Sequence, residues 1–323
     1  MLFRFYDDSL RGVQKISVDG LVPDTPYHLS HWKKNLTPSV FKADTSTEIA
    51  FKFIGTEKAG DHFPGVTLIT NNHFDTDGLF SVWTLLNPHR AEGLKPLLVC
   101  AAEAGDFHTF THDEAVQVHL LVEALRDSPE SPIRSVQESR DAACYSALLP
   151  SLPDLLQKKG EHEHLWREPF EEILLSFSLF EKGIILLEEF EEERLSVIID
   201  QKRPAREAVD RYCQGDLYLM VQDREADKGG FCYELEYRYY TWADTVERPQ
   251  ITPIPMADLA LHLERHERNS DGRWMPGGYA GQGLTAVLKF TDPSGRDIPS
   301  SLHPEEVIHF VRAHLDAHKG LQD

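Results

Sequence analysis

Cysteine is scarce in this sequence. The chain of 323 residues holds four cysteines, none of them paired as C-x-x-C, at positions 100, 144, 213 and 232. Structural zinc sites and thiol redox centres need closely spaced cysteines, so the sequence argues against both classes of protein. We expect reduced, mostly structural thiols, as in a protein of the cytoplasm.

Long apolar runs and basic residues are also in short supply. No segment reaches the ~20 apolar residues that a helix needs to cross a bilayer, and the N-terminal segment MLFRFYDD lacks the long apolar core of a signal peptide. Only 33 Lys and Arg stand against 53 Asp and Glu, a net charge of −20. Long nucleic acids are held through many basic contacts. These features predict a soluble, cytoplasmic protein without a membrane or long nucleic-acid partner, and they remain compatible with a small phosphorylated substrate held through metal ions.

One stretch combines a strand, an acidic turn and a helix. The apolar, β-branched run at residues 66–70 predicts a buried strand, and His73, Asp75 and Asp77 follow at alternate positions before Gly78. The next segment has the i, i+3, i+4, i+7 stripe of a helix packed on a sheet, at Leu79, Val82, Trp83 and Leu86. The acidic turn therefore lies at the carboxyl end of a strand, where open α/β sheets usually bind ligands.

The three polar side chains of this turn favour a metal site. In an extended segment His73, Asp75 and Asp77 point the same way, and their carboxylates repel each other unless a cation lies between them. Mixed oxygen and nitrogen ligands suit Mn²⁺, Zn²⁺, Fe²⁺ or Mg²⁺. The alternative is that Asp75 or Asp77 only caps the helix, which leaves the other acid and the histidine unexplained.

A second acidic turn is expected to meet the first. The apolar run at residues 96–102 predicts another buried strand, followed by a turn that contains Asp106 and then by a helix with the apolar stripe Val118, Leu121, Val122 and Leu125. Two strands joined by a helix pair in parallel, so we expect Asp106 to converge on Asp75 and Asp77. The competing interpretation makes Asp106 a cap. Four histidines are weaker candidates for the same site and are more often turn or packing residues, namely His28, His31, His108 and His112.

The pattern H-x-D-x-D-G-L-x-S at residues 73–81, with an apolar strand before it, resembles the first motif of the DHH phosphoesterase superfamily. That superfamily includes RecJ-type exonucleases, nanoRNA and cyclic-dinucleotide phosphodiesterases and manganese-dependent pyrophosphatases. The resemblance implies a two-domain protein with a divalent-metal site, usually Mn²⁺, that cleaves phosphoester or phosphoanhydride bonds. His73, Asp75 and Asp77 would be metal ligands, and Asp106 stands where the second motif supplies an aspartate. The Asp-His-His triplet of the superfamily is absent from the sequence. The whole chain also resembles a bacterial family of unknown function.

The chain is long enough for two domains. We expect an α/β domain over residues 1–160, a helical linker with eleven glutamates over 161–194, and a smaller α+β domain over 195–323. His162 and His164 begin the linker and are expected to be exposed. In the last domain the patterns predict strands at 195–200, 216–221, 231–242 and 284–290, and helices at 204–211, 255–267 and 303–318.

The most glycine-rich loop, residues 272–283, is a candidate phosphate site. Arg273, Gly277 and Gly278 would bring a guanidinium and backbone amides to a phosphate. DHH-type proteins carry a glycine-rich substrate loop in their C-terminal domain, although the letters here differ from Gly-Gly-His. The alternative is an ordinary surface loop.

The sequence thus predicts an α/β fold with a mainly parallel sheet flanked by helices and a second, smaller α+β domain. The function it favours is metal-dependent hydrolysis of a small phosphodiester or phosphoanhydride. One or two ions, with Mn²⁺ preferred over Mg²⁺, Zn²⁺ or Fe²⁺, would be held by His73, Asp75, Asp77 and Asp106. The alternatives are a non-catalytic ligand- or partner-binding protein on a DHH-like scaffold and metal chemistry unrelated to phosphate. Catalysis itself and the oligomeric state, including a homodimer, are left open.

Overall fold

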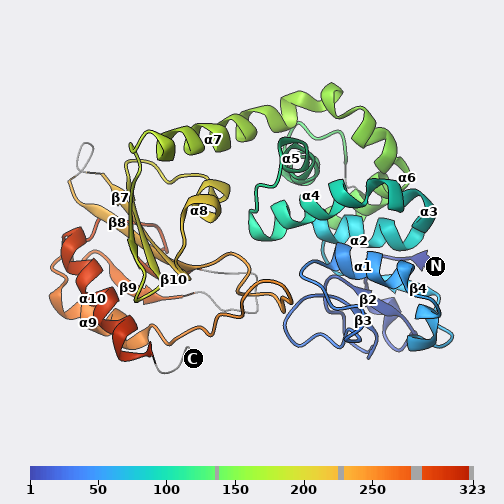
Figure 1. The fold of residues 1–323 in the computed structure, drawn as a ribbon, viewed down its shortest axis with the longest axis horizontal. Coiled ribbons are helices and arrows are strands. Elements are labelled where there is room, and N and C mark those ends of the chain that lie inside the picture. The colour runs from blue at the N-terminus through green and yellow to red at the C-terminus, as the bar shows by residue number, and fades with distance from the viewer. Residues whose placement is uncertain (135–137, 225–228, 278–285, 320–323) are drawn as a thin grey trace. The chain divides into compact units, whose positions relative to one another are not determined.

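The computed structural model describes residues 1–134, 138–224, 229–277 and 286–319. The chain is mixed α/β and divides into two compact units (Figure 1). The first unit comprises Met1–Glu172 and Ala243–Pro249, and the second comprises Ile173–Trp242 and Gln250–Asp323. This division differs from the expected boundaries at residues 160 and 194. The boundary after Glu172 lies within the helix Glu163–Glu181, and the later segment Ala243–Pro249 belongs to the first unit.

The first unit contains a four-stranded parallel sheet. Its order is β1 (Leu2–Phe3), β4 (Leu68–Thr70), β2 (Ile16–Val18) and β3 (His28–Leu29). Every neighbouring pair in this sheet is parallel, so the carboxyl ends of all four strands lie at one edge. The strand expected at residues 66–70 is present as β4, whereas the short strands β1 and β3 were not anticipated.

Two helices pack on this sheet and carry the caps that the sequence indicates. Helix α1 (Ser46–Gly55) begins with a capping box between Thr45 and Glu48, which the order T-S-T-E at residues 45–48 predicts. Helix α2 (Thr76–Leu86) follows β4 and buries Leu79, Val82 and Trp83. Figure 1 shows α1 and α2 over the strands, with α4 and α5 beyond them.

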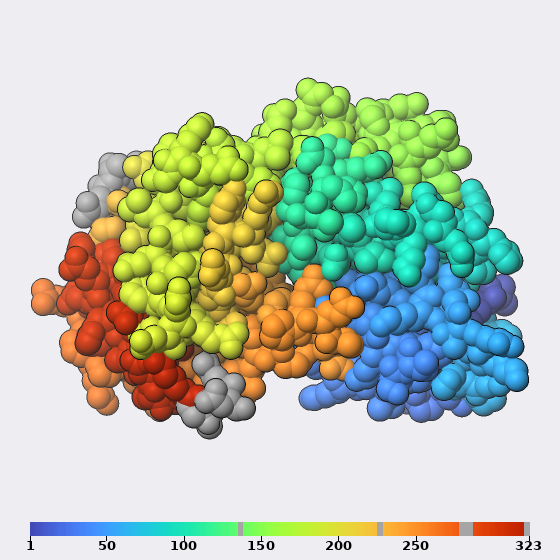
Figure 2. All heavy atoms as spheres, in the orientation of Figure 1, coloured from blue at the N-terminus to red at the C-terminus, as the bar shows by residue number. Residues whose placement is uncertain are grey.

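The strand predicted at residues 96–102 is wrong. These residues belong to helix α4 (Lys95–Phe107), which buries Leu98, Ala101 and Ala102 at helical spacing. A short apolar run does not distinguish a buried strand from a buried helix, and here Pro96 in the first turn together with Leu and Ala favours the helix. Helix α5 (Asp113–Asp127) follows and buries the predicted apolar stripe. In the space-filling view the teal residues of α4 and α5 lie directly against the blue residues of the same unit (Figure 2).

The remaining elements of the first unit are helical. They are α3 (Pro88–Ala91), α6 (Arg140–Gln157) and the start of α7 (Glu163–Glu181). The acidic helix expected over 161–194 is too long, because α7 ends at Glu181 and Gly183 follows in the left-handed conformation with φ 64°. Glycine adopts this conformation readily, and it ends helices for that reason.

The second unit is built on a six-stranded mixed sheet. Only β6 and β7 pair in parallel among its neighbouring strands in the described residues. The order is β5 (Leu186–Phe190), β6 (Leu195–Asp200), β7 (Leu217–Asp223), β8 (Phe231–Tyr237), β10 (Ala286–Thr291) and β9 (Arg273–Pro276). The helices are α8 (Arg206–Tyr212), α9 (Ala257–His266) and α10 (Pro304–Ala317). These strands and helices match the elements predicted for the second half within a few residues, apart from β5, β9 and the long expected extension of β8 beyond Tyr237.

Candidate metal centre

Three parallel strands of the first unit deliver polar side chains to one edge of the sheet. Strand β2 is followed directly by Asp19, and β3 is followed two residues later by His31. Strand β4 leads into the turn with His73, Asp75 and Asp77. Because the strands are parallel, residues distant in the sequence meet at their common carboxyl ends.

The first group of these side chains surrounds the His31 imidazole. Its Nε2 atom lies 3.6 Å from Asp19 Oδ1, 3.6 Å from Asp77 Oδ2 and 3.4 Å from Asp106 Oδ2. All four side chains are buried. Ligands that are ~2.1 Å from a tetrahedrally coordinated metal are about 3.4 Å apart, so this spacing has the size of a coordination shell.

The second group is centred on the His73 imidazole and is closer to solvent. Its Nε2 atom lies 3.0 Å from Asp19 Oδ2 and 3.0 Å from Asp75 Oδ2. The side chains of His73 and Asp75 are 26% and 31% exposed, whereas Asp19 is buried. Asp19, His31 and Asp77 of the first group meet the geometry of a metal-binding cluster, and so do Asp19, His73 and Asp75 of the second. They share Asp19, which turns one carboxylate oxygen toward each histidine.

The acids are held by hydrogen bonds from the N-terminus of α1 and from β4. The backbone N–H groups of Ser46 and Thr47 each donate to Asp77, at 2.7 Å. The Ser46 hydroxyl donates to Asp19 Oδ1 at 3.0 Å, and the Asn71 amide donates to Asp19 Oδ2 at 3.3 Å. A helix N-terminus favours negative charge, so α1 stabilises the carboxylate that lies deepest in the site.

The two ring nitrogens of His31 face different groups. Its Nδ1 atom lies 2.5 Å from the carbonyl oxygen of Asp44. A carbonyl oxygen only accepts, so Nδ1 donates this hydrogen bond, while Nε2 faces the three carboxylates. Metal-binding histidines are oriented in this way, with the second nitrogen donating to a backbone carbonyl or a carboxylate.

The crowded charges shift the pKa values of the site. Burial and the charge of Asp19 raise the pKa of Asp77 to about 6. Burial, followed by the charges of Asp77 and Asp75, raises the pKa of Asp106 well above its usual range. Burial also disfavours the charged forms of Asp19 and His73. At Asp19 the attraction to His73 outweighs this penalty and lowers the pKa to about 2. At His73 the charges of Asp75 and Asp19 together outweigh it and raise the pKa to about 11. The cluster therefore contains more negative charge than its own residues neutralise, which is the condition that a bound cation relieves.

The structure places Asp106 beside Asp77 and His31 by a route that the sequence did not indicate. Asp106 lies at the end of helix α4 instead of on a turn after a parallel strand. Asp75 caps α2, because its Oδ1 accepts a hydrogen bond from the Gly78 N–H at 2.7 Å, and its Oδ2 faces His73. Its role as a metal ligand stays a prediction.

The other candidate histidines lie outside the two groups. His28 accepts the Leu36 N–H at 2.9 Å through Nδ1 and stabilises a loop. His112 caps α5, and His108 ends α4 in the left-handed conformation. His162 ends the short 3-10 turn before α7 and is half-buried, whereas His164 lies in the first turn of α7 and is exposed.

Asp19 is the site residue that sequence reasoning missed. It follows an apolar strand and precedes Gly20, the same order of strand, acid and glycine that marks the central motif. That order was its only signal. Its backbone has φ 62°, and a side chain on Gly20 would collide with Asn71 and His73. The close approach of two loops therefore brings Asp19 to the centre of the site.

The proposed phosphate contacts lie in the second unit. Arg273 begins β9 and is exposed, and the Gly277 N–H donates to the Val287 carbonyl at 3.0 Å instead of pointing to a free ligand position. Gly278 lies outside the described residues. The role of this loop in phosphate binding stays a prediction.

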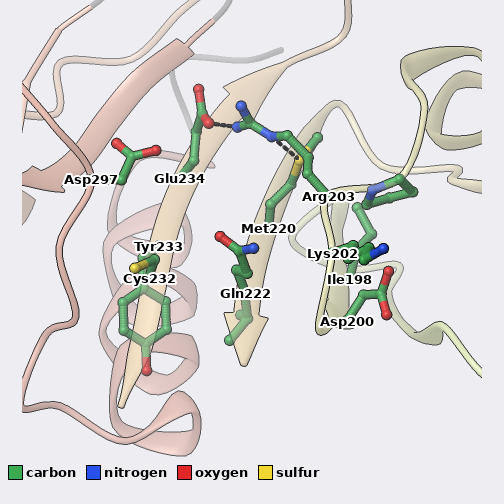
Figure 3. Close-up of a pocket in the computed structure, with 12 residues that line it drawn as sticks. Ile198, Asp200, Lys202, Arg203, Met220, Gln222, Cys232, Tyr233, Glu234 and Asp297 are labelled. Atoms are coloured by element: carbon green, nitrogen blue, oxygen red, sulfur yellow. Dashed lines mark hydrogen bonds and ion pairs between the residues drawn. The ribbon is translucent and has the colours of Figure 1, made fainter. Parts of the chain in front are cut away.

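The second unit also has a hollow of its own (Figure 3). Arg203 reaches across it to Glu234, which also pairs with Lys289 at 2.8 Å. Within the part of the chain that the structure describes, the groups of His, Cys, Asp and Glu able to hold a metal lie in the first unit.

One protein-family model matches residues 2–322, and it describes a family of unknown function (DUF6687). No curated protein and no solved structure matches the chain. In the described residues, none of the helices is long and apolar enough to cross a membrane.

The packing around Gly78 gives a test of how tightly the site is built. A Cβ atom at Gly78 would lie 2.6 Å from Asn71 Nδ2, 2.7 Å from the Tyr145 hydroxyl and 3.0 Å from Asp19 Oδ2. We expect Gly78→Ala to lower the free energy of unfolding by about 1–3 kcal/mol, as overpacking does, measured by urea denaturation. Gly93→Ala is the matched control, because its Cβ would meet nothing within 4 Å. Equal stability of the two variants would contradict the close packing described here.

Proposed function

The chain belongs to DUF6687, a family of unknown function, and from its metal centre we propose that it is a metal-dependent hydrolase of a small phosphodiester or phosphoanhydride. The observation that carries this proposal is the Asp19 carboxylate, which is shared by two groups of His and Asp side chains. If divalent ions are bound, Asp19 would contribute a carboxylate oxygen to each group, and paired ions are a recurrent device of phosphatases and nucleases.

The donor set fits a hard divalent cation. Two imidazole nitrogens and the oxygens of four aspartates match the preferences of Mn²⁺, with Mg²⁺, Zn²⁺ and Fe²⁺ as alternatives. Asp106 Oδ2 is buried and accepts no hydrogen bond from the described residues. A buried carboxylate oxygen in that position is costly unless positive charge reaches it, which supports a cation beside His31. When bound, divalent ions supply polarisation of a phosphoryl oxygen and a lowered pKa of water.

We assign different roles to the buried and the exposed residues of the site. His31, Asp77 and Asp106 form the buried part, where two backbone amides orient Asp77 and the Asp44 carbonyl orients His31. His73 and Asp75 form the part that solvent and a substrate reach. We assign binding and orientation of the phosphoryl group to this exposed side.

The resemblance of residues 73–81 to the first DHH motif supports the same chemistry, since that superfamily cleaves phosphoester and phosphoanhydride bonds. The missing triplet leaves the superfamily's consecutive histidines without a counterpart. His31, from a different strand, offers an imidazole to the same cluster of aspartates.

Metal binding is the first prediction of this proposal. We expect up to two Mn²⁺ ions per chain in isothermal titration calorimetry after removal of bound metal with EDTA. Asp19→Asn removes the shared carboxylate charge. Loss of a residue that only orients a metal ligand weakens metal binding about 10–100-fold, and we expect a larger loss of Mn²⁺ affinity here. Asp154→Asn on α6 is the control, because its side chain is exposed and it makes the same change of charge. Equal Mn²⁺ affinity in the Asp19 and Asp154 variants would contradict the bridging role.

Turnover is the second prediction. The Mn²⁺-loaded protein is expected to release product from at least one member of a panel of pyrophosphate, short oligonucleotides and cyclic dinucleotides. Asp77→Asn is expected to lower kcat on the order of 100-fold or more, because Asp77 would hold a cation that offsets the negative charge of the transition state. Asp154→Asn should retain full activity. Tight Mn²⁺ binding without turnover on any member of the panel would instead support a non-catalytic binding protein.

A further inference from the structure

A short segment of the first unit that follows strand β8 of the second unit in the sequence contacts His31 and Asp44 beside the candidate metal centre. Residues 243–249, which we call the strap, belong to the first unit, although Trp242 and Gln250 on either side belong to the second. We propose that Arg248 of the strap is a positioning residue of the metal centre, which sets the distance between His31 and Asp106 without touching a ligand ion. This inference rests on the proposed function.

The strap is fastened to the side chain of Asp44. The Asp44 carboxylate accepts hydrogen bonds from the backbone N–H groups of Val246 at 2.5 Å, Glu247 at 2.8 Å and Arg248 at 3.2 Å. It also accepts a hydrogen bond from the Arg248 guanidinium at 2.7 Å. Asp44 is buried, and its own main-chain oxygen accepts a hydrogen bond from His31 Nδ1. The residue that holds the strap therefore also orients the His31 ring.

The strap also contacts the backbone of His31. The Asp244 N–H donates to the His31 carbonyl at 2.7 Å, and Trp32 forms an antiparallel bridge with Ala243. Asp244 is itself anchored by Lys42 at 2.6 Å. His31 is consequently fixed at its ring by Asp44 and at its backbone by the strap.

The same guanidinium reaches the helix end that carries Asp106. Arg248 donates to Glu103 at 2.8 Å and lies 4.4 Å from the centre of the Phe107 ring. Glu103 is one helical turn before Asp106, and Phe107 follows it directly. Arg248 thus connects the Asp44 loop to the end of α4, the two places that present His31 Nε2 and Asp106 Oδ2 to each other at 3.4 Å.

Arginine is suited to this task where lysine is not. Its planar fork bonds two carboxylates in fixed directions, whereas lysine offers one compact charge on a flexible stem. The Arg248 side chain is only 19% exposed and pairs with both Asp44 and Glu103. Outer contacts of this kind tune metal affinity by orienting the ligands.

The test uses the full chain and compares metal affinity with stability. In Mn²⁺ titration calorimetry, Arg248→Met is expected to raise the dissociation constant of the ion at His31 about 10–100-fold. The visible absorption spectrum of the Co²⁺-loaded protein is expected to change, because the ligand geometry changes. Arg248→Lys retains the charge but not the fork, so we expect intermediate affinity. Glu103→Gln removes the charge of the Arg248–Glu103 pair and leaves the Asp44 contact intact. It is expected to weaken binding in the same direction and serves if Arg248→Met does not fold.

The control is Arg140→Met, in the same unit. Arg140 donates to the carbonyls of Leu125 and Arg126 at 2.7 and 2.6 Å, away from the ligands. We expect it to lower the urea midpoint while leaving Mn²⁺ affinity and the Co²⁺ spectrum unchanged. Unchanged affinity and spectrum in both Arg248→Met and Glu103→Gln, beside a wild type that binds Mn²⁺, would overturn the positioning role alone. A wild type that binds no divalent metal would overturn the proposed function as well.

Discussion

Mutual repulsion among buried carboxylates is the constraint around which the first unit is organised. Asp19, Asp77 and Asp106 are all buried within reach of the single His31 ring nitrogen. In a region of low dielectric such charges raise one another's pKa values unless donors or cations neutralise them. The surrounding fold supplies donors to Asp19 and Asp77, whereas Asp106 Oδ2 receives no hydrogen bond from the described residues. This imbalance is the strongest reason to assign a cation to the site.

The elements of the first unit each meet a part of this requirement. The parallel sheet gathers acids and imidazoles at one edge, and the N-terminus of α1 directs two amides at Asp77. Helix α4 adds Asp106 from the side, and the strap connects that helix to the loop that orients His31. The site is thus formed by strand ends, a helix N-terminus, a helix C-terminus and the strap. No single sequence motif contains all of its residues. Its exposed side is the pair His73 and Asp75, whose side chains are partly exposed, whereas Asp19 beside them is buried.

Prediction from sequence was most accurate where a local pattern and its tertiary role agree. The capping box of α1, the apolar stripe of α2 and the paired acids that follow β4 depend on neighbouring residues, and the structure contains all three. The strands and helices of the second half were predictable for the same reason, since their alternation and periodicity are strong. The strand expected at residues 96–102 was wrong because a short buried run satisfies either period, and packing of Leu98 and Ala102 decides for the helix.

The sequence by itself determined the existence of an acidic turn after β4 and the kinds of ligand it offers, because residue types and their alternation specify both. Only the tertiary structure decided that Asp19 is shared, that His31 rather than His28 faces the acids, and that Arg248 connects the two sides of the site. These features join residues separated by tens to more than two hundred positions. Their proximity results from parallel strand pairing and from the path of the strap, which no local pattern of residues encodes.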